Sequence, residues 1–151
     1  MMHMLTRRVA PVVVVLAIGA SAALAQAPSS TTLYKRIGGY DAIAAVIDDF
    51  VPRLATDPQL AKYFAGAGHD TQMHIRQLAV DYFCHAAGGP CLYIGRPLKQ
   101  THAGLGISES DWQTAAKHFT ATLEKFKVAK AERDELVAIV DGLKGEIVEK
   151  K

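Results

Sequence analysis

Apolar residues recur every three or four positions along most of the chain after residue 31, and this period predicts α-helices. No stretch alternates apolar and polar residues with the period of two that is typical of a β-strand. The sequence therefore predicts an all-α fold with four main helices and some short ones. The expected helices lie at about residues 41–55, 71–87, 97–103, 109–126 and 128–151.

Residues that start or break helices refine these limits. Thr32 is a plausible N-cap for a short turn over 33–37, and Ser108 with Asp111 three positions later forms a near capping box. Pro52 lies inside the first long helix, where we expect it either to kink that helix or to split it into two turns. The acidic residues are expected on solvated helix faces.

The first 25 residues have the features of a secretory signal peptide. Arg7 and Arg8 precede an apolar run over 9–20, and Ala23-Leu24-Ala25 is a small-residue cleavage site. The alternative is an uncleaved membrane anchor, against which the short run and Pro11 argue. The sequence thus predicts an exported protein, periplasmic in a Gram-negative source. It also predicts a flexible stub over 26–31 and one domain over 32–151.

Composition and charge describe an ordinary globular domain. Half of the residues are apolar, which excludes a disordered chain. Removal of the signal takes Arg7 and Arg8 with it and leaves 15 basic and 15 acidic residues. Because this balance offers no basic excess, nothing in the composition indicates nucleic acid. No further stretch is long and apolar enough to predict a membrane span in the mature chain.

The two cysteines, Cys84 and Cys91, allow two interpretations. Their spacing fits no zinc motif. In an exported protein they can form a disulfide that closes the intervening turn, or they can be two separate buried side chains. The sequence leaves both readings open.

One histidine has an unusual setting. His102 lies four residues after Leu98 on a very short predicted helix, and Gly104 and Gly106 follow it directly. One ring nitrogen would then be free to coordinate while the other binds a nearby carbonyl. A single histidine in apolar surroundings suits haem iron, which needs only one axial protein ligand, better than zinc. We expect the other histidines to be solvated or packed: His69, His85 and His118.

Three segments together resemble the group I truncated haemoglobins: LYKRIGGYDAIAAVIDDF over 33–50, DPQLAKYFAG over 57–66 and GGPCLYIGRPLKQTHAGLGIS over 88–108. The resemblance extends from about Leu33 to Val148. It implies a two-over-two sandwich of α-helices around a b-type haem, with His102 as the proximal iron ligand. The last helix has no histidine and the chain has no CxxCH motif, so the resemblance implies a non-covalent haem.

The resemblance also implies which other residues surround the haem. Residues expected to line its faces are Phe50, Phe64, Ile75, Ala79 and Phe83. Residues expected near its propionates are Tyr93, Arg96 and Lys99. By contrast, Trp112 and Phe119 are expected in the core.

This chain departs from the family on the distal side of the haem. Val51 stands where many members have a tyrosine that hydrogen-bonds the gas ligand, and Ala79 stands where members often have glutamine. Leu78 replaces a histidine found in some relatives. The alignment therefore predicts an apolar distal pocket. The chain is also about three residues longer before this helix, and a slipped register would bring His74 or Gln77 inward instead.

Three functions remain open from the sequence. The first is a haem protein that reversibly binds O₂, NO or CO. The second is a haem enzyme, with NO dioxygenase-like or peroxidase-like chemistry and a reductase partner that the sequence does not identify. The third, of another class, is a helical interaction protein without a cofactor.

Overall fold

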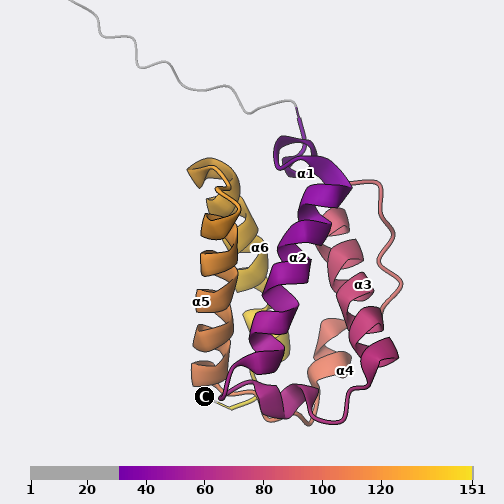
Figure 1. Ribbon diagram of the computed structural model, residues 1–151, viewed down its shortest axis with the longest axis vertical. Helices are drawn as coiled ribbons and strands as arrows, with labels where there is room; N and C mark the ends of the chain where they lie inside the picture. The colour runs from indigo at the N-terminus through magenta and orange to yellow at the C-terminus, as the bar shows by residue number, and fades with distance from the viewer. Residues whose placement is uncertain (1–30, 151) are drawn as a thin grey trace, which may run out of the picture.

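The computed structural model describes residues 31–150. The expected signal segment over 1–25 and most of the stub lie outside these residues, so both stay predictions. Figure 1 shows the described chain as a stack of helices. Within residues 31–150 the nearest approach to a strand is an isolated bridge between Ser108 and Lys150.

The prediction of an all-α fold is confirmed. The elements in chain order are α1 (Leu33–Arg36), α2 (Gly39–Thr56), a 3-10 turn η1 (Ala61–Phe64), α3 (His69–Ala86), α4 (Leu98–His102), α5 (Glu109–Lys125) and α6 (Lys130–Ile147). Their limits differ from the predicted ones by a few residues, as is usual where helices fray.

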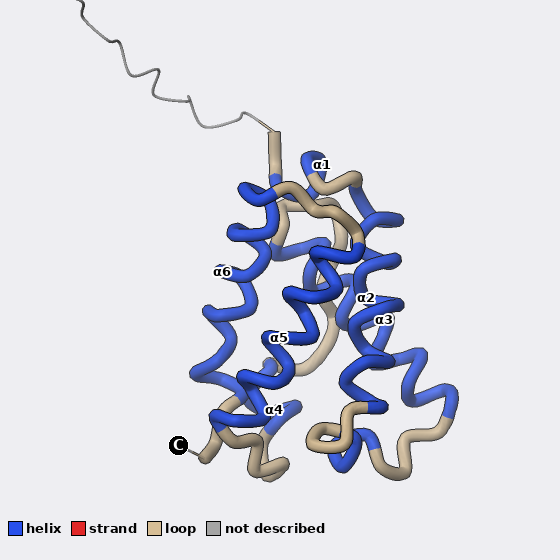
Figure 2. Tube along the Cα trace, turned by 60° about the vertical axis from the view of Figure 1, so that its left-hand side comes forward, coloured by secondary structure: helices blue, strands red, loops and turns tan. Residues whose placement is uncertain are grey.

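Two pairs of helices make the sandwich. Helix α2 packs against α3, α5 packs against α6, and α2 also packs against α5, which joins the two layers. Figures 1 and 2 show α4 near one end of this arrangement, beside the lower ends of the long helices. The core between the layers is apolar and includes Ile47, Val80, Phe119 and Leu123, each at most 1 % exposed.

Helix α2 continues through Pro52 without a break. Pro52 has no N–H to donate to the carbonyl of Asp48, but the Thr56 hydroxyl donates to the Pro52 carbonyl at 2.8 Å. Asp49, one turn earlier, accepts hydrogen bonds from Arg53, Thr122 and Lys125. These bonds fasten α2 to α5 next to the proline, so the sandwich supports the helix where its own ladder loses a bond.

The start of α5 confirms the capping box and corrects one expectation. The Ser108 hydroxyl accepts from the Asp111 N–H at 3.2 Å, and Asp111 Oδ2 accepts from the Ser108 N–H at 3.0 Å. The expectation that the acidic residues lie on solvated faces is wrong for Asp111, which is 4 % exposed. Its carboxylate also accepts hydrogen bonds from Gln59 and Tyr63, so burial leaves no oxygen without a donor.

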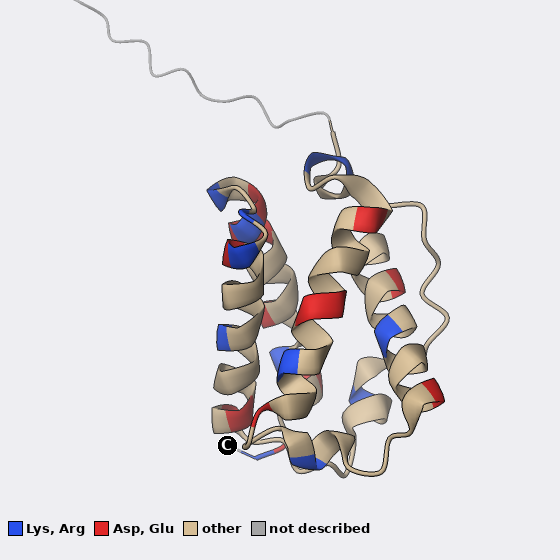
Figure 3. Cartoon of the chain, viewed as in Figure 1, with Lys and Arg blue, Asp and Glu red and all other residues tan. Residues whose placement is uncertain are grey.

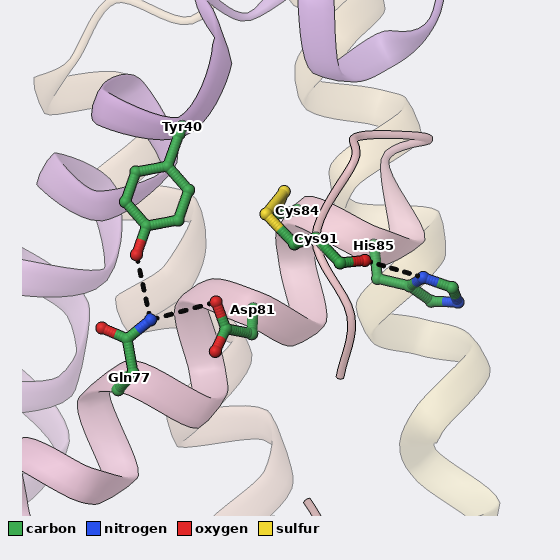
Figure 4. The surroundings of a disulfide bond; sticks show 6 residues. All are labelled: Tyr40, Gln77, Asp81, Cys84, His85 and Cys91. Atoms are coloured by element: carbon green, nitrogen blue, oxygen red, sulfur yellow. Dashed lines mark hydrogen bonds between the residues drawn. A yellow bond between two sulfur atoms is a disulfide. The ribbon is translucent and has the colours of Figure 1, made fainter. Parts of the chain in front are cut away.

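Cys84 and Cys91 are bonded to each other, which decides between the two readings of this pair. Figure 4 shows the bond between the last turn of α3 and the loop that follows it. Cys84 is fully buried. The His85 ring faces the same loop, with Nδ1 3.3 Å from the Cys91 carbonyl oxygen. The loop is thus attached to α3 at its beginning.

Charged residues of both signs are mixed over the helices in the view of Figure 3. On this face the arrangement agrees with the absence of a basic excess in the sequence. Within residues 31–150 no helix combines the length and the apolar character needed to cross a bilayer.

Candidate haem site

The site is built around the short helix α4. His102 is the last residue of α4, and its Nδ1 lies 2.8 Å from the carbonyl oxygen of Leu98 one turn earlier. Because a carbonyl only accepts, Nδ1 carries the proton in this contact, and the lone pair is on Nε2. No group within residues 31–150 forms a hydrogen bond with His102 Nε2. The half-buried imidazole is therefore oriented by its own helix and keeps a nitrogen suited to bind a metal.

The residues expected on the opposite side of the haem lie on α3 and on the second half of α2. Ile75, Leu78 and Ala79 on α3 and Val51 on α2 are all half-buried. Helix α4 packs against α6 rather than extensively against α3, within the described part of the chain. Two elements that would face a planar cofactor from opposite sides are thus not in close contact with each other.

Polar side chains of α3 bind partners on α2 and on α3 itself. The Gln77 amide donates to the Tyr40 hydroxyl at 2.9 Å and to Asp81 Oδ1 at 3.0 Å, as Figure 4 shows. Arg76, the residue before Gln77, binds Asp48 through two hydrogen bonds, which also attach α3 to α2. His74 is exposed. The Gln77 amide therefore already has protein partners, while the register of α3 relative to the haem stays a prediction.

Aromatic rings fill the interior next to these residues. The Phe119 ring lies between Phe50, with centroids 5.2 Å apart and edge-on, and Phe83, with centroids 5.4 Å apart and stacked. Phe119 and Trp112 are both buried, as expected for core residues. Phe50 and Phe83 thus belong to the core cluster, and their place beside the haem stays a prediction.

A cavity of about 110 Å³ lies among α2, α3, α5 and α6. Its walls are almost entirely apolar, and Phe83 and Phe119 form part of them. Val46 and Val128 are among the other side chains that line it. An apolar space of this size suits small uncharged molecules better than water, which needs polar partners.

The residues expected near the haem propionates lie in the loop between α3 and α4 and at the start of α4. The Tyr93 ring packs edge-on against Tyr82 with centroids 5.3 Å apart, and its hydroxyl donates to the Arg96 carbonyl at 2.9 Å. Arg96 and Lys99 are exposed, and neither side chain has an ion-pair partner within residues 31–150. Two unpaired cations close to α4 are therefore available to bind carboxylates.

Phe64 is the last residue of η1, and two residues that precede it are hydrogen-bonded to α5. The Tyr63 hydroxyl donates to Asp111 Oδ2 at 2.8 Å, and the Gln59 amide donates to Asp111 Oδ1 at 2.8 Å. The Ser108 hydroxyl, with these further donors, holds the pKa of the Asp111 carboxyl well below its usual value. An ionised Asp111 thus fixes the turn that carries Phe64. The sequence showed the capping box but not the partners Gln59 and Tyr63.

The other histidines have separate surroundings. His69 is exposed at the start of α3, and His85 is exposed at its end. His118 Nε2 lies 2.8 Å from Asp57 Oδ2, so the His118 ring has a partner within the protein, as expected for a packed histidine. Within residues 31–150 no three histidine, cysteine or acidic side chains are grouped as metal ligands.

Solved structures with the same fold define the class. The truncated hemoglobin of Tetrahymena pyriformis superposes with a TM-score of 0.72 at 21 % identity, over 80 % of this chain and 100 % of that one. A structure from Chlamydomonas reinhardtii superposes with a TM-score of 0.66 at 30 % identity, over 82 % of this chain and 100 % of that one. The fold and the histidine site thus define a truncated, two-over-two globin.

Sequence comparison gives the family. The model of the bacterial-like globin family matches residues 32–149. Group 1 truncated hemoglobin GlbN of Nostoc commune is 35 % identical over 120 residues, which cover 80 % of this chain and 99 % of the relative. The protein of the same name from Mycolicibacterium paratuberculosis is 32 % identical over 116 residues, 77 % and 83 % of the two chains. The chain belongs to the bacterial-like globin family, in its group 1 truncated branch.

The residues present fit the cofactor of this family, a non-covalent haem. His102 presents an imidazole with no protein partner for Nε2, the α3 side is apolar, and two unpaired cations lie nearby. Helix α6 contains no histidine that would form a covalent link. One contact near His102 was not visible in the sequence: the Gly104 and Gly106 N–H groups donate to Glu149.

Proposed function

We propose that this protein is an exported globin that binds O₂, NO or CO reversibly at a haem held by His102. The single observation that supports it most is the bond from His102 Nδ1 to Leu98, which leaves Nε2 as the metal-binding nitrogen. The bound haem would supply the iron at which the gas is held. This chain's residues would bind, orient and enclose it.

The proximal side would be controlled by His102 and the backbone of α4. A ring whose Nδ1 donates to a carbonyl is fixed in tautomer and rotation, and its Nε2 becomes a better electron donor. The 2.8 Å contact between His102 Nδ1 and Leu98 oxygen is of this kind. The propionates of the haem would pair with Arg96 and Lys99 at the exposed edge.

The distal side would be controlled by the absence of a donor. Val51, Ile75, Leu78 and Ala79 carry no polar group in their side chains, and Gln77 is occupied by Tyr40 and Asp81. Bound O₂ gains negative charge and is stabilised by a hydrogen-bond donor, whereas CO and NO depend on one less. We therefore expect fast O₂ dissociation, rapid autoxidation, and comparatively strong binding of NO and CO.

Visible spectra of the purified, haem-loaded protein in ferric, ferrous and ferrous–CO forms test the proposal. The expected result is a Soret band that shifts with CO in the wild type and is altered in His102→Gly. Added imidazole should restore the wild-type spectrum in this variant, because the small ligand can occupy the space left by the side chain. His85→Ala, which removes an exposed histidine, is the matched control and should leave every band unchanged.

The outcomes separate the three candidate functions. No haem band in the wild type would support the cofactor-free interaction protein. A haem band that His102→Gly leaves unchanged would refute His102 as the ligand. Catalytic conversion of NO to nitrate with a reductase and O₂ would favour the haem enzyme over a reversible gas carrier. Oxygen affinity as tight as in tyrosine-bearing relatives would contradict the apolar distal side.

Export is a separate part of the proposal and rests on residues 1–25 alone. The expected result is a protein found outside the cytoplasm whose N-terminus, by mass spectrometry, begins after Ala25. A full-length chain retained in the membrane fraction would instead support the uncleaved anchor.

A further inference from the structure

The backbone directly after His102 makes a tight turn. Gly104 has a φ of 82° and Gly106 has a φ of 66°, a left-handed conformation that other residues rarely adopt. The Leu105 N–H donates to the His102 carbonyl at 3.2 Å. The N–H groups of Gly104 and Gly106 are therefore turned toward one acceptor, as in the backbone nests that bind anions.

The side chain of Glu149 fills this nest. Its Oε1 accepts from the Gly104 N–H at 2.7 Å, and its Oε2 accepts from the Gly106 N–H at 2.6 Å. Each carboxylate oxygen thus has its own backbone donor, the arrangement that makes charge-assisted bonds strong and directional. Figure 1 places the end of the described chain beside the start of α5, at the end of the molecule where α4 also lies.

Backbone bonds hold Glu149 in place. The Glu149 and Lys150 N–H groups both donate to the Ile107 carbonyl, at 2.9 and 3.1 Å, and the Glu109 N–H donates to the Lys150 carbonyl at 3.0 Å. The segment after α6 is therefore attached on both sides of the side chain. Because the backbone of Glu149 is held in this way, only its side-chain torsions remain to be ordered when the carboxylate binds the two glycines.

We propose that Glu149 is a positioning residue for His102, acting through the N–H groups of Gly104 and Gly106. This inference rests on the proposed function, because it assumes that His102 is the iron ligand. Helix α4 has only five residues and is too short to be rigid alone. The bond to Leu98 fixes the rotation of the imidazole, whereas Glu149 fixes the backbone from which the imidazole projects.

Resonance Raman spectroscopy of the ferrous haem protein tests this role, because the iron–histidine stretching band depends on the tilt and strain of the imidazole. In Glu149→Ala we expect this band to shift and broaden, and haem to dissociate about fivefold faster, because both hydrogen bonds from the glycine N–H groups are lost. Glu149→Gln retains a single side-chain carbonyl oxygen and should show a smaller shift. Asp141→Ala removes an exposed acid on α6 and is the matched control.

A second readout needs no haem. Amide hydrogen exchange of the haem-free protein should show protected Gly104 and Gly106 N–H groups in the wild type and in Asp141→Ala. In Glu149→Ala these two amides should exchange faster. Equal exchange in all variants would overturn the proposed contact.

Each remaining outcome decides the proposal. An unchanged iron–histidine band in Glu149→Ala, even with a lower melting temperature, would show a merely structural role and overturn the inference, while the proposed function stands. A wild type without a haem band would overturn the proposed function and this inference with it. A band that shifts equally in Asp141→Ala would show a general effect of charge and also overturn it.

Discussion

Cys84, fully buried at the end of α3, is bonded to Cys91 in the loop that leads to α4. The bond fixes the loop that carries Tyr93 and Arg96 to α3, the helix expected on the distal side of the haem. The helices expected on the two sides of the haem are thus connected through a short segment that is covalently attached to α3. Since the loop continues directly into α4, the mobility of the loop also affects the position of α4 and therefore of His102.

Loss of this bond should lower stability. Closing a ring of about eight residues is worth about 2.5 kcal/mol in the chain-entropy model. We expect Cys91→Ser to reduce the free energy of unfolding by about this amount, as measured by urea denaturation of the haem-free protein. A thiol reductant should destabilise the wild type similarly and have no further effect on Cys91→Ser. Equal stability of wild type and variant would contradict a stabilising role.

A donor placed on the distal side should slow O₂ dissociation. Val51→Tyr would bring a hydroxyl to the position where tyrosine-bearing relatives have one. One added hydrogen bond is worth about 1–1.5 kcal/mol, so O₂ should dissociate about tenfold more slowly, as measured by stopped flow. Val51→Phe has nearly the same size without the hydroxyl and should lack this effect. If both variants slow O₂ equally, steric closure explains the change.

Asp111 should make stability depend on pH. Its pKa is lowered in the folded protein, so its contribution is complete above the unfolded-state pKa of about 4 and is lost as pH falls toward the folded value. At pH 7 we expect Asp111→Ala to lose about 2–3 kcal/mol of unfolding free energy, because a buried capping box and its partners from η1 are broken.

Urea denaturation at a series of pH values checks this prediction. The difference between wild type and Asp111→Ala should shrink steadily below about pH 4. The exposed Asp141→Ala should stay within about 0.5 kcal/mol of the wild type throughout. A difference that is constant with pH would show that the Asp111 charge contributes nothing.

Arg96 and Lys99 should retain haem by their charge. Both are exposed, so each ion pair with a propionate is worth at most about 1 kcal/mol. We expect Arg96→Ala and Lys99→Ala each to speed haem transfer to an acceptor protein by up to about fivefold, and less at high salt. Lys117→Ala, an exposed cation on α5, should have no effect. Salt-independent loss in either variant would indicate a packing role.

The local features of this fold were predictable because their partners lie within one helical turn. Thr32 caps α1 and Ser108 caps α5, as predicted, since an N-cap and its N–H are three residues apart. The short helix ending near His102 follows from the proline before it and the glycines after it. The departures at Val51 and Ala79 likewise follow from the sequence, although their effect on the gas ligand stays a prediction.

Contacts between distant segments were decided only by the tertiary structure. The sequence left open whether Cys84 and Cys91 form a disulfide, because a disulfide requires their Cα atoms to lie close together. In the folded protein these Cα atoms are 5.7 Å apart. The sequence placed Asp111 on a solvated face, because the donors Gln59 and Tyr63 are about fifty residues away, in the turn before η1 and in η1. The attachment of α3 to α2 likewise depends on residues far apart in the sequence, because Arg76 binds Asp48 and Gln77 binds Tyr40.

By itself the sequence predicted the helices, their caps, the family and the histidine that we expect to bind iron. These depend on periodicity and on motifs of neighbouring residues, which exist before the chain folds. Only the tertiary structure decided which polar groups hold the site in place. Glu149 shows the reason: it meets Gly104 and Gly106 across more than forty residues, and only the packing of α6 against α4 brings the carboxylate to those two N–H groups.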